Sequence, residues 1–239
     1  MNKVVLSGSN LSKSFGGVHA VRRVSLELGP DAPVTTIIGP NGAGKTTLLN
    51  LLCGAIPLDE GKVEFKGADI TGVRMRQRMK MGIARTFQHT GIFGRLTPRE
   101  HFFLMARNLG PGSKWHSIEQ FLDIFNLETF ADVQAESLNH VSQRLLEIGM
   151  IVSASPSVLM LDEPTAGMDL AETAQIASVI RELRGIMQVM IIEHDIDFVL
   201  DISDRIIVLD QGAVIASGLP DEIQRDDVVA AAYMRRGHR

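Results

Sequence analysis

A glycine-rich segment between an apolar run and a helical run constrains the fold of this chain more than any other feature. Residues 39–46 read GPNGAGKT, which fits the pattern G-x-x-x-x-G-K-[ST]. Pro33–Ile38 before it is a candidate buried strand, and Lys45–Cys53 after it is a candidate helix closed by Gly54. In this order the backbone N–H groups and the helix N-terminus point at phosphate oxygens. The sequence therefore predicts a phosphate-binding loop, in which Lys45 reaches the β- and γ-phosphates and Thr46 binds Mg²⁺.

A second apolar run ends in two acidic residues. Val158–Leu161 is a candidate buried strand, and Asp162 and Glu163 follow it directly. Ligands of parallel sheets bind at the carboxyl ends of the strands. We therefore expect Asp162 to hold Mg²⁺ through water and Glu163 to polarise an attacking water as a general base. The alternative is an ordinary strand end with two solvated acids.

Strand-like and helix-like runs alternate through the last third of the chain, which favours a parallel sheet covered on both faces. The middle is different, because Ile118, Phe121, Leu122 and Phe125 fall on one helix face and Leu145–Val152 reads as a buried helix. We expect one domain over 1–239. Its nucleotide-binding core with a β subdomain comprises 1–87 and 155–239, and its helical subdomain comprises 88–154.

Composition excludes several classes of protein. The net charge is −4, so binding to nucleic acid is not expected. Cys53 is the single cysteine, and no run approaches the roughly 18 apolar residues of a membrane span. If the protein serves a membrane process, we expect it to act from the cytoplasmic side, docked on another subunit. A basic run is expected to be a solvated helix face; it consists of Arg74, Arg76, Arg78, Lys80 and Arg85.

The motifs resemble those of ABC ATPases. Residues 161–169, LDEPTAGMD, resemble the Walker B and D-loop segments, and residues 191–195, IIEHD, resemble the switch-histidine segment. Thr86–Gln88 resembles the Q-loop, and Gly39–Thr47 is similar to the Walker A segment in full. These motifs occur in the family's order over nearly the whole chain. The resemblance implies an α/β fold: a P-loop NTPase core, an antiparallel β subdomain and an inserted helical subdomain.

Three further phrases resemble the ATP-binding subunits of branched-chain amino-acid importers, whose relatives include urea importers; they are 85–89, 143–148 and 228–233. The resemblance implies ATP hydrolysis coupled to import, with ATP and Mg²⁺. It implies membrane-spanning permease subunits, a second ATPase chain and, indirectly, a solute-binding protein. It places the chain on the cytoplasmic face of the inner (plasma) membrane. The direction of transport rests on the resemblance alone, and the solute stays open.

The same resemblance implies further roles for single residues. His194 would contact the γ-phosphate, Gln88 would lie at Mg²⁺ and the attacking water, Asp169 would lie between two ATPase chains, and Phe15 would stack on adenine. The candidate catalytic residues are Glu163, His194 and Gln88. The candidate metal-binding residues are Thr46, Gln88 and Asp162. The candidate nucleotide-binding residues are Phe15, Gly39, Asn41, Gly42, Ala43, Gly44, Lys45, Thr46 and Thr47.

The chain departs from the family at the signature loop, where Leu138–Ser142 reads LNHVS in place of LSGGQ. A β-branched residue such as Val141 disfavours positive φ and blocks close backbone approach. We therefore expect a weakened half-site and favour a heterodimer of ATPase chains, although a homodimer stays open. The segment Gly91–Glu100 is expected to face the membrane subunit, with Ile92, Phe93 and Leu96 either as exposed anchors or as internal packing.

Three alternatives have less support. An ABC ATPase acting on DNA or ribosomes predicts a second cassette, coiled-coil arms or a basic surface, and the sequence has none of these. A regulatory subunit that binds ATP without turnover conflicts with the presence of Glu163 and His194. A small GTPase would carry an Asn-Lys-x-Asp motif after the core strands, which is absent.

Overall fold

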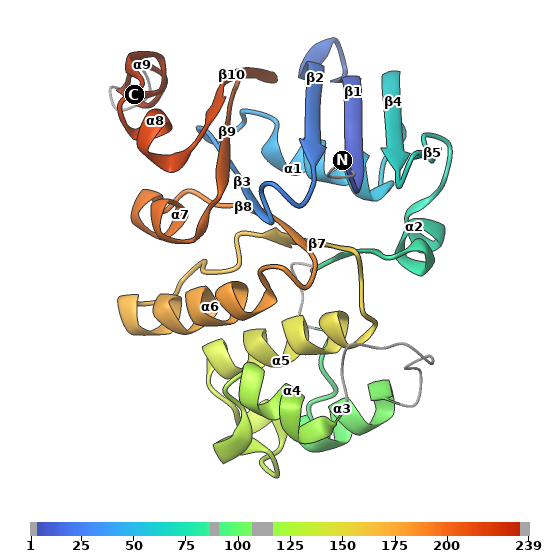
Figure 1. Cartoon of the computed structure of the whole chain (residues 1–239), viewed down its shortest axis with the longest axis vertical. Helices are drawn as coiled ribbons and strands as arrows, with labels where there is room; N and C mark the ends of the chain where they lie inside the picture. Colours follow the sequence, from blue (N-terminus) through green and yellow to red (C-terminus); the bar gives the residue numbers. More distant parts are fainter. Residues whose placement is uncertain (1–3, 87–90, 107–116, 235–239) are drawn as a thin grey trace.

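The computed structural model describes residues 4–86, 91–106 and 117–234. Figure 1 shows an antiparallel sheet at one end, a core sheet in the middle and a group of helices at the other end. The strands are β1 Leu6–Phe15, β2 Val18–Leu28, β3 Val34–Ile38, β4 Glu60–Phe65, β5 Ala68–Asp69, β6 Ile83–Arg85, β7 Val158–Asp162, β8 Gln188–Ile192, β9 Arg205–Asp210 and β10 Ala213–Gly218. The helices are α1 Lys45–Cys53, α2 Met75–Met81, α3 Pro98–Ala106, α4 Ile118–Ile124, α5 His140–Ser153, α6 Leu170–Leu183, α7 Ile196–Ile202, α8 Pro220–Gln224 and α9 Asp227–Met234, with 3₁₀ turns at Glu128–Phe130 and Ala135–Ser137.

The core sheet is six-stranded, in the order β10-β9-β3-β8-β7-β6. All its pairings are parallel except that of β10 with β9. Successive residues of β7 and β8 enter different apolar clusters: Leu159 and Val189 pack toward α5 and α6, whereas Met160 and Met190 pack toward α1. Because helices and the second sheet cover both faces, these strands are apolar throughout, as predicted.

The second sheet is antiparallel, with the order β2-β1-β4-β5. Its buried residues share one cluster with the leucines of α1 and with one face of the core sheet. The segment Val63–Phe65 lies in β4, and the chain turns at Gly67 into the short edge strand β5. Helix α1 is therefore fixed between two sheets, and the residues at its N-terminus are held rigidly.

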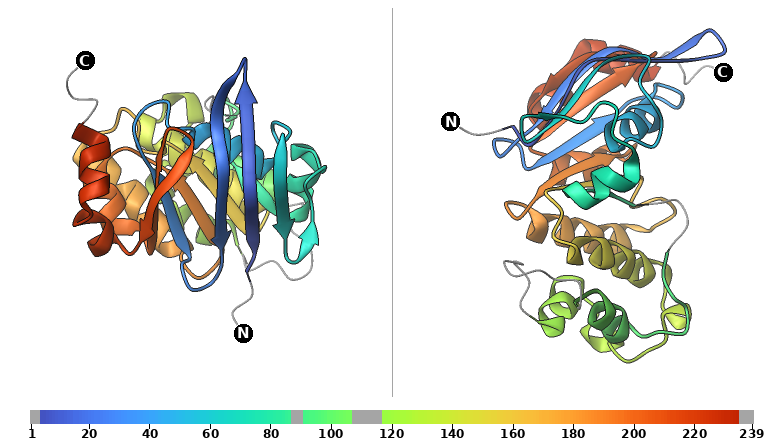
Figure 2. Two further views of the ribbon diagram at one scale, coloured as in Figure 1. Left: turned by 90° about the horizontal axis from the view of Figure 1, so that it is seen from above. Right: turned by 90° about the vertical axis from the view of Figure 1, so that its right-hand side faces the viewer.

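The described residues between β6 and β7 form α3, α4, α5 and the two 3₁₀ turns, joined by loops, and they contain no strand. Figure 2 shows α3 and α4 at the opposite end of the molecule from the antiparallel sheet. Their centre is a cluster of three aromatic rings, in which Phe102 stacks on Phe121 at 5.1 Å between ring centroids and Phe125 packs on both. The expected helix at 118–125 and the expected buried helix at 145–152 are both present.

The expectation of a solvated basic face is wrong for two of its residues. The Arg78 side chain is 2% exposed, and its guanidinium donates to five backbone carbonyl oxygens, those of Leu51, Leu52, Ile70, Thr71 and Val73. Two of these carbonyls end α1, where helical C=O groups have no partner within the helix. Burial lowers the pKa of Arg78. Arg85 is also buried, whereas Arg74, Arg76 and Lys80 are exposed.

Within 4–86, 91–106 and 117–234, no helix combines the length and the apolar character that a bilayer span requires.

Candidate nucleotide-binding site

The glycine-rich loop follows β3 and forms the start of α1, as the sequence predicts. Gly39 and Gly44 have φ values of 145° and 102°, in the region that favours glycine. A Cβ atom at Gly39 would lie 2.0 Å from the Leu209 carbonyl oxygen, and one at Gly44 would lie 2.1 Å from the Ala20 carbonyl oxygen. The loop therefore packs directly on the backbones of β9 and β2, and a larger residue has no room there.

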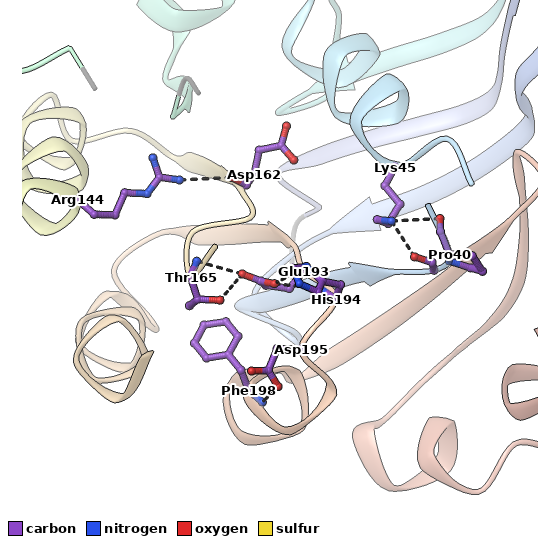
Figure 3. A network of polar contacts seen from close by, with 10 residues as sticks. Pro40, Lys45, Arg144, Asp162, Thr165, Glu193, His194, Asp195 and Phe198 are labelled. Carbon is purple, nitrogen blue, oxygen red and sulfur yellow. Dashed lines mark hydrogen bonds and ion pairs between the residues drawn. The ribbon is translucent and has the colours of Figure 1, made fainter. Parts of the chain in front are cut away.

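The Lys45 side chain lies inside this loop and is 7% exposed. Its ammonium donates to the carbonyl oxygens of Gly39 at 2.7 Å and Pro40 at 3.3 Å (Figure 3). Among the other predicted loop residues, Ala43 is buried, Gly44 and Thr47 are half-buried, and Asn41, Gly42 and Thr46 are exposed. The loop thus presents backbone and a lysine charge at the N-terminus of a helix, the arrangement that binds phosphate.

The two acidic residues meet this loop in one pocket. Asp162 ends β7, which lies two strands from β3 in the sheet. A pocket of about 300 Å³ is lined by Thr46, His140, Arg144, Asp162, Glu163, Pro164 and Ala166. The structure therefore brings Thr46 together with Asp162 and Glu163, which follow it by more than 100 residues in the sequence, at the carboxyl end of the parallel strands.

The surroundings of Asp162 fit a divalent cation. Its Oδ2 atom is buried and accepts no hydrogen bond from the described residues, and the nearest Arg85 guanidinium nitrogen lies 3.5 Å away. Burial raises the pKa of Asp162, and the Arg85 charge partly opposes this rise. A buried carboxylate oxygen facing the same pocket as the Thr46 hydroxyl is the hard oxygen donor set that Mg²⁺ prefers.

Sequence reasoning missed two arginines of this site. Arg85 carries the ion pair with Asp162, and an Arg144 guanidinium nitrogen donates to the Asp162 carbonyl oxygen at 3.3 Å (Figure 3). The signal for Arg85 is its place directly after Ile83 and Ala84, in a strand rather than on a helix face. Arg144 gives no comparable signal, because its contact depends on how α5 packs on β7.

Glu163 has an unusual backbone. Its φ is 46°, a value uncommon outside glycine, and its amide donates to the Ile192 carbonyl oxygen at 2.9 Å. Non-glycine residues hold this conformation where their surroundings impose it, often at functional sites. Here the bond to β8 fixes the turn, and the exposed Glu163 side chain lines the pocket.

His194 lies beside a buried carboxylate. Glu193 is fully buried, and its Oε2 accepts from the His194 backbone N–H at 2.9 Å and lies 3.4 Å from His194 Nδ1. Its Oε1 accepts from the Thr165 backbone N–H at 3.1 Å and from the Thr165 hydroxyl at 2.5 Å. The His194 side chain itself is 61% exposed. Sequence reasoning did not single out Glu193 or Thr165.

The remaining predicted site residues lie around this centre. Phe15 ends β1 and is 51% exposed. Asp169 caps α6, where its carboxylate accepts from the Glu172 N–H at 2.9 Å while Glu172 accepts from the Asp169 N–H. Gln88 lies outside the described residues, so its predicted role is untested.

The signature loop, Leu138–Ser142, has a different conformation from the one expected at Val141. Asn139 is the N-cap of α5, and its side-chain oxygen accepts from the Ser142 N–H at 2.9 Å. Val141 lies inside the helix and is 1% exposed, with its side chain in the core. The expectation that Val141 needs positive φ or blocks backbone approach is therefore wrong. Asn139 and His140 are the exposed residues, at the N-terminus of a 14-residue helix.

Comparison with known sequences gives a consistent result. Residues 21–166 match the family model described as ABC transporter. The chain is 35% identical to the high-affinity branched-chain amino acid transport ATP-binding protein LivG of Escherichia coli (strain K12), over 98% of this chain and 99% of that protein. It is equally similar to BraF of Pseudomonas aeruginosa, whose description is the same. The lipopolysaccharide export system ATP-binding protein LptB of Haemophilus influenzae is 31% identical over 96% of this chain and 97% of the relative.

Solved structures agree with the sequences. The ADP conformation of MJ1267, an ATP-binding cassette of an ABC transporter, superimposes with a TM-score of 0.84 at 30% identity, over 98% of this chain and 99% of that one. The structure of cbiO1 from Clostridium perfringens, part of the ABC transporter complex cbiONQ, gives 0.81 at 25% identity, over 98% and 96%.

Proposed function

This chain belongs to the ABC transporter family as an ATP-binding, ATP-hydrolysing subunit, and from that premise we propose that it powers the import of branched-chain amino acids or similar small polar solutes. The likeness to LivG and BraF over nearly the full length supports this class of solute. For the chemistry, the carrying observation is that Thr46, Asp162 and Glu163 line one pocket at the N-terminus of α1.

In this proposal the loop binds the phosphates and the acidic residues act on them. The backbone N–H groups of the loop 39–46 and the Lys45 ammonium hold the β- and γ-phosphates. Lys45 gives up its bonds to the Gly39 and Pro40 carbonyl oxygens when it binds them. Thr46 and Asp162 would hold Mg²⁺, which would neutralise phosphate charge when bound. Phe15 and its exposed ring stack on adenine. Gly39, Asn41, Gly42, Ala43, Gly44 and Thr47 complete the nucleotide-binding set.

Hydrolysis then needs a positioned water. Glu163 accepts the proton of this water as general base. Its side chain lines the pocket, and the backbone bond to β8 fixes the turn that carries it. His194 donates to the γ-phosphate, and Gln88 would position the water and bind Mg²⁺. The roles of Glu163 and His194 are supported by their gathering at the ends of neighbouring strands, and that of Gln88 by the resemblance of Thr86–Gln88 to the Q-loop.

The partners follow from the exposed surface around the site. Leu170 at the start of α6 is 86% exposed beside Asp169, and Phe93 before α3 is 56% exposed. Single exposed apolar side chains are ordinary on a surface, so the assignment of these two rests on their places, beside Asp169 and in the segment Gly91–Glu100. We assign the first to a second ATPase chain and the second to membrane-spanning permease subunits on the cytoplasmic face of the inner membrane. A solute-binding protein acts indirectly, and residues 88–154 form a helical subdomain on the core of 1–87 and 155–239.

We propose that this chain forms a heterodimer with a different ATPase chain, on the evidence of one residue of the signature loop. It rests on Asn139 in place of the family's serine, because Val141 packs inside the core. Asn139→Ser is the useful restoring variant, since Val141→Gly would open a cavity. A rise in the ATPase activity of the assembled complex with Asn139→Ser supports a weakened half-site. Unchanged activity contradicts it.

The first test is light scattering of the full chain carrying Glu163→Gln, with and without ATP and Mg²⁺. We expect ATP binding without hydrolysis, and a monomer that dimerises only when the second ATPase chain is added. An ATP-dependent homodimer would contradict the heterodimer. Unchanged turnover would remove Glu163 from the base role.

The solute is tested in cells. Deletion of the gene for this chain is expected to lower uptake of radiolabelled leucine and to leave urea uptake unchanged. The reverse pattern would replace the amino-acid proposal with the urea alternative. No change in either would contradict both.

A further inference from the structure

The fully buried carboxylate of Glu193 is not used by the proposed chemistry, although it lies between two segments that are. Taking an ionised carboxylate out of water costs several kcal/mol unless other groups hold it by hydrogen bonds and charge. The contacts that hold Glu193 come from Thr165, in the loop before α6, and from His194, which follows it in the chain. Figure 3 shows the three residues in a row.

The chemistry of these contacts needs a carboxylate. The Thr165 N–H, the Thr165 hydroxyl and the His194 N–H all donate, so both carboxylate oxygens only accept. A glutamine of the same shape has one accepting oxygen and an NH₂ group. It can therefore accept from Thr165 or from the His194 N–H, and its NH₂ group then faces the donors on the other side. The position therefore favours a side chain with two accepting oxygens over an amide of the same shape.

The carboxylate also orients the His194 ring. Nδ1 lies 3.4 Å from Glu193 Oε2, longer than a good hydrogen bond but close enough for charge to act. A carboxylate at this position favours the hydrogen on Nδ1, and Nε2 then faces the other way. Within the described residues, the polar contact of this exposed ring is that of Nδ1 with Glu193.

The other end of the row reaches the surface. Thr165 is buried, but Ala166, Gly167 and Asp169 after it are exposed, and Leu170 is 86% exposed. A second chain that contacts this loop can therefore shift Thr165, whose hydroxyl donates directly to Glu193. The Glu193 backbone N–H in turn donates to the Ile37 carbonyl oxygen, two residues before the glycine loop begins, so the backbone at Glu193 is anchored to β3.

We propose that Glu193 is a positioning residue that couples the loop before α6 to the His194 ring, so that contact of a second chain with this loop sets the orientation of the histidine. The proposal rests on the proposed function, because it takes His194 to face the nucleotide. It assigns Glu193 no contact with the nucleotide or with the reacting atoms.

The test uses the full chain with Glu193→Gln, and Thr165→Val as a second variant that removes only the hydroxyl. Thr165→Ser keeps the hydroxyl and is the matched control. Three quantities are measured: thermal unfolding, the ¹⁵N shifts of the His194 ring nitrogens assigned with His194→Ala, and the kcat and KM for ATP. Outer residues that orient a histidine usually contribute about 10- to 100-fold to activity.

We expect folded Glu193→Gln to lose the Nδ1–H pattern of His194 and to lower kcat by about 10- to 100-fold, with a KM for ATP within about threefold of wild type. Thr165→Val should shift the ring pattern and kcat in the same direction, and Thr165→Ser should match wild type. The variant that carries both Glu193→Gln and Thr165→Val should have the same kcat as Glu193→Gln alone. An unchanged ring tautomer and kcat in folded Glu193→Gln would overturn the proposal.

Other outcomes are also decisive. If Glu193→Gln does not fold, Thr165→Val decides by the same readouts, and a wild-type tautomer and kcat in Thr165→Val overturn the proposal. If the wild-type chain and its complexes do not hydrolyse ATP, the proposed function fails. The ring-nitrogen shifts then still show whether Glu193 orients His194.

Discussion

Replacement of Arg78 by methionine should destabilise the chain more than its surface-like sequence context suggests. The guanidinium donates to five carbonyl oxygens at 2.7–3.0 Å, including two at the end of α1. Each buried acceptor left without its donor costs about 1–3 kcal/mol, whereas the cost of burying the charge is recovered. Because these two effects oppose each other, we take a net cost of about 4 kcal/mol, at the upper end for a single substitution.

For a chain of this size, 1 kcal/mol changes Tm by about 2–4 °C, so Arg78→Met should lower Tm by about 8–16 °C. The assay is thermal unfolding followed by circular dichroism at 222 nm. Arg76→Met is the matched control, because Arg76 lies on the same helix and is exposed, and its change should stay within about 0.5 kcal/mol. Equal shifts in the two variants would refute the reasoning from the five contacts.

Three further outcomes follow from single contacts. Gly39→Ala places a Cβ 2.0 Å from the Leu209 carbonyl oxygen, so ATP affinity measured by calorimetry should fall at least about tenfold; retained affinity would show that the loop can shift. Lys45→Ala removes the charged donor of the loop and should weaken ATP binding by about 10- to 100-fold; a folded variant with normal affinity would contradict its role. The pKa of Asp59 lies below its ordinary value of 3.8 because Lys13 and a backbone amide hold the ionised form, so its stabilising effect is present above pH 3.8 and is lost as the pH falls through the folded pKa. Asp59→Asn should therefore lower Tm at about pH 7 but not well below pH 3.8, and a difference that persists in acid would refute this.

The sequence predicted those parts of the site whose geometry is local. A glycine loop between a strand and a helix contains in one segment all the groups that bind phosphate, and Gly39–Thr46 forms as expected. The meeting of Thr46 with Asp162 and Glu163 followed from one general rule about parallel sheets, and the pocket agrees with it.

Contacts between distant segments were not predictable in the same way. Arg78 has its place because α1 ends beside it, which no pattern around residue 78 reveals. Val141 was misread because the helix α5 begins one residue earlier, at His140, and its side chain turns into the core. The burial of Glu193 depends on the loop at Thr165 closing over it. The roles of Phe15 and Gln88 stay predictions.

The position of β6 has a consequence for the order in which the chain folds. This strand is at the edge of the described core sheet and pairs only with β7 there, from Ile83 with Val158 to Arg85 with Met160. The whole helical region separates the two strands in the chain, so their pairing closes a long loop, whereas α3, α4 and α5 contact one another over short separations. Strand β6 should therefore join last and exchange its amide hydrogens early. Since Arg85 on this strand is the charge beside Asp162, we expect the ion pair at this pocket to form only at the final step of folding.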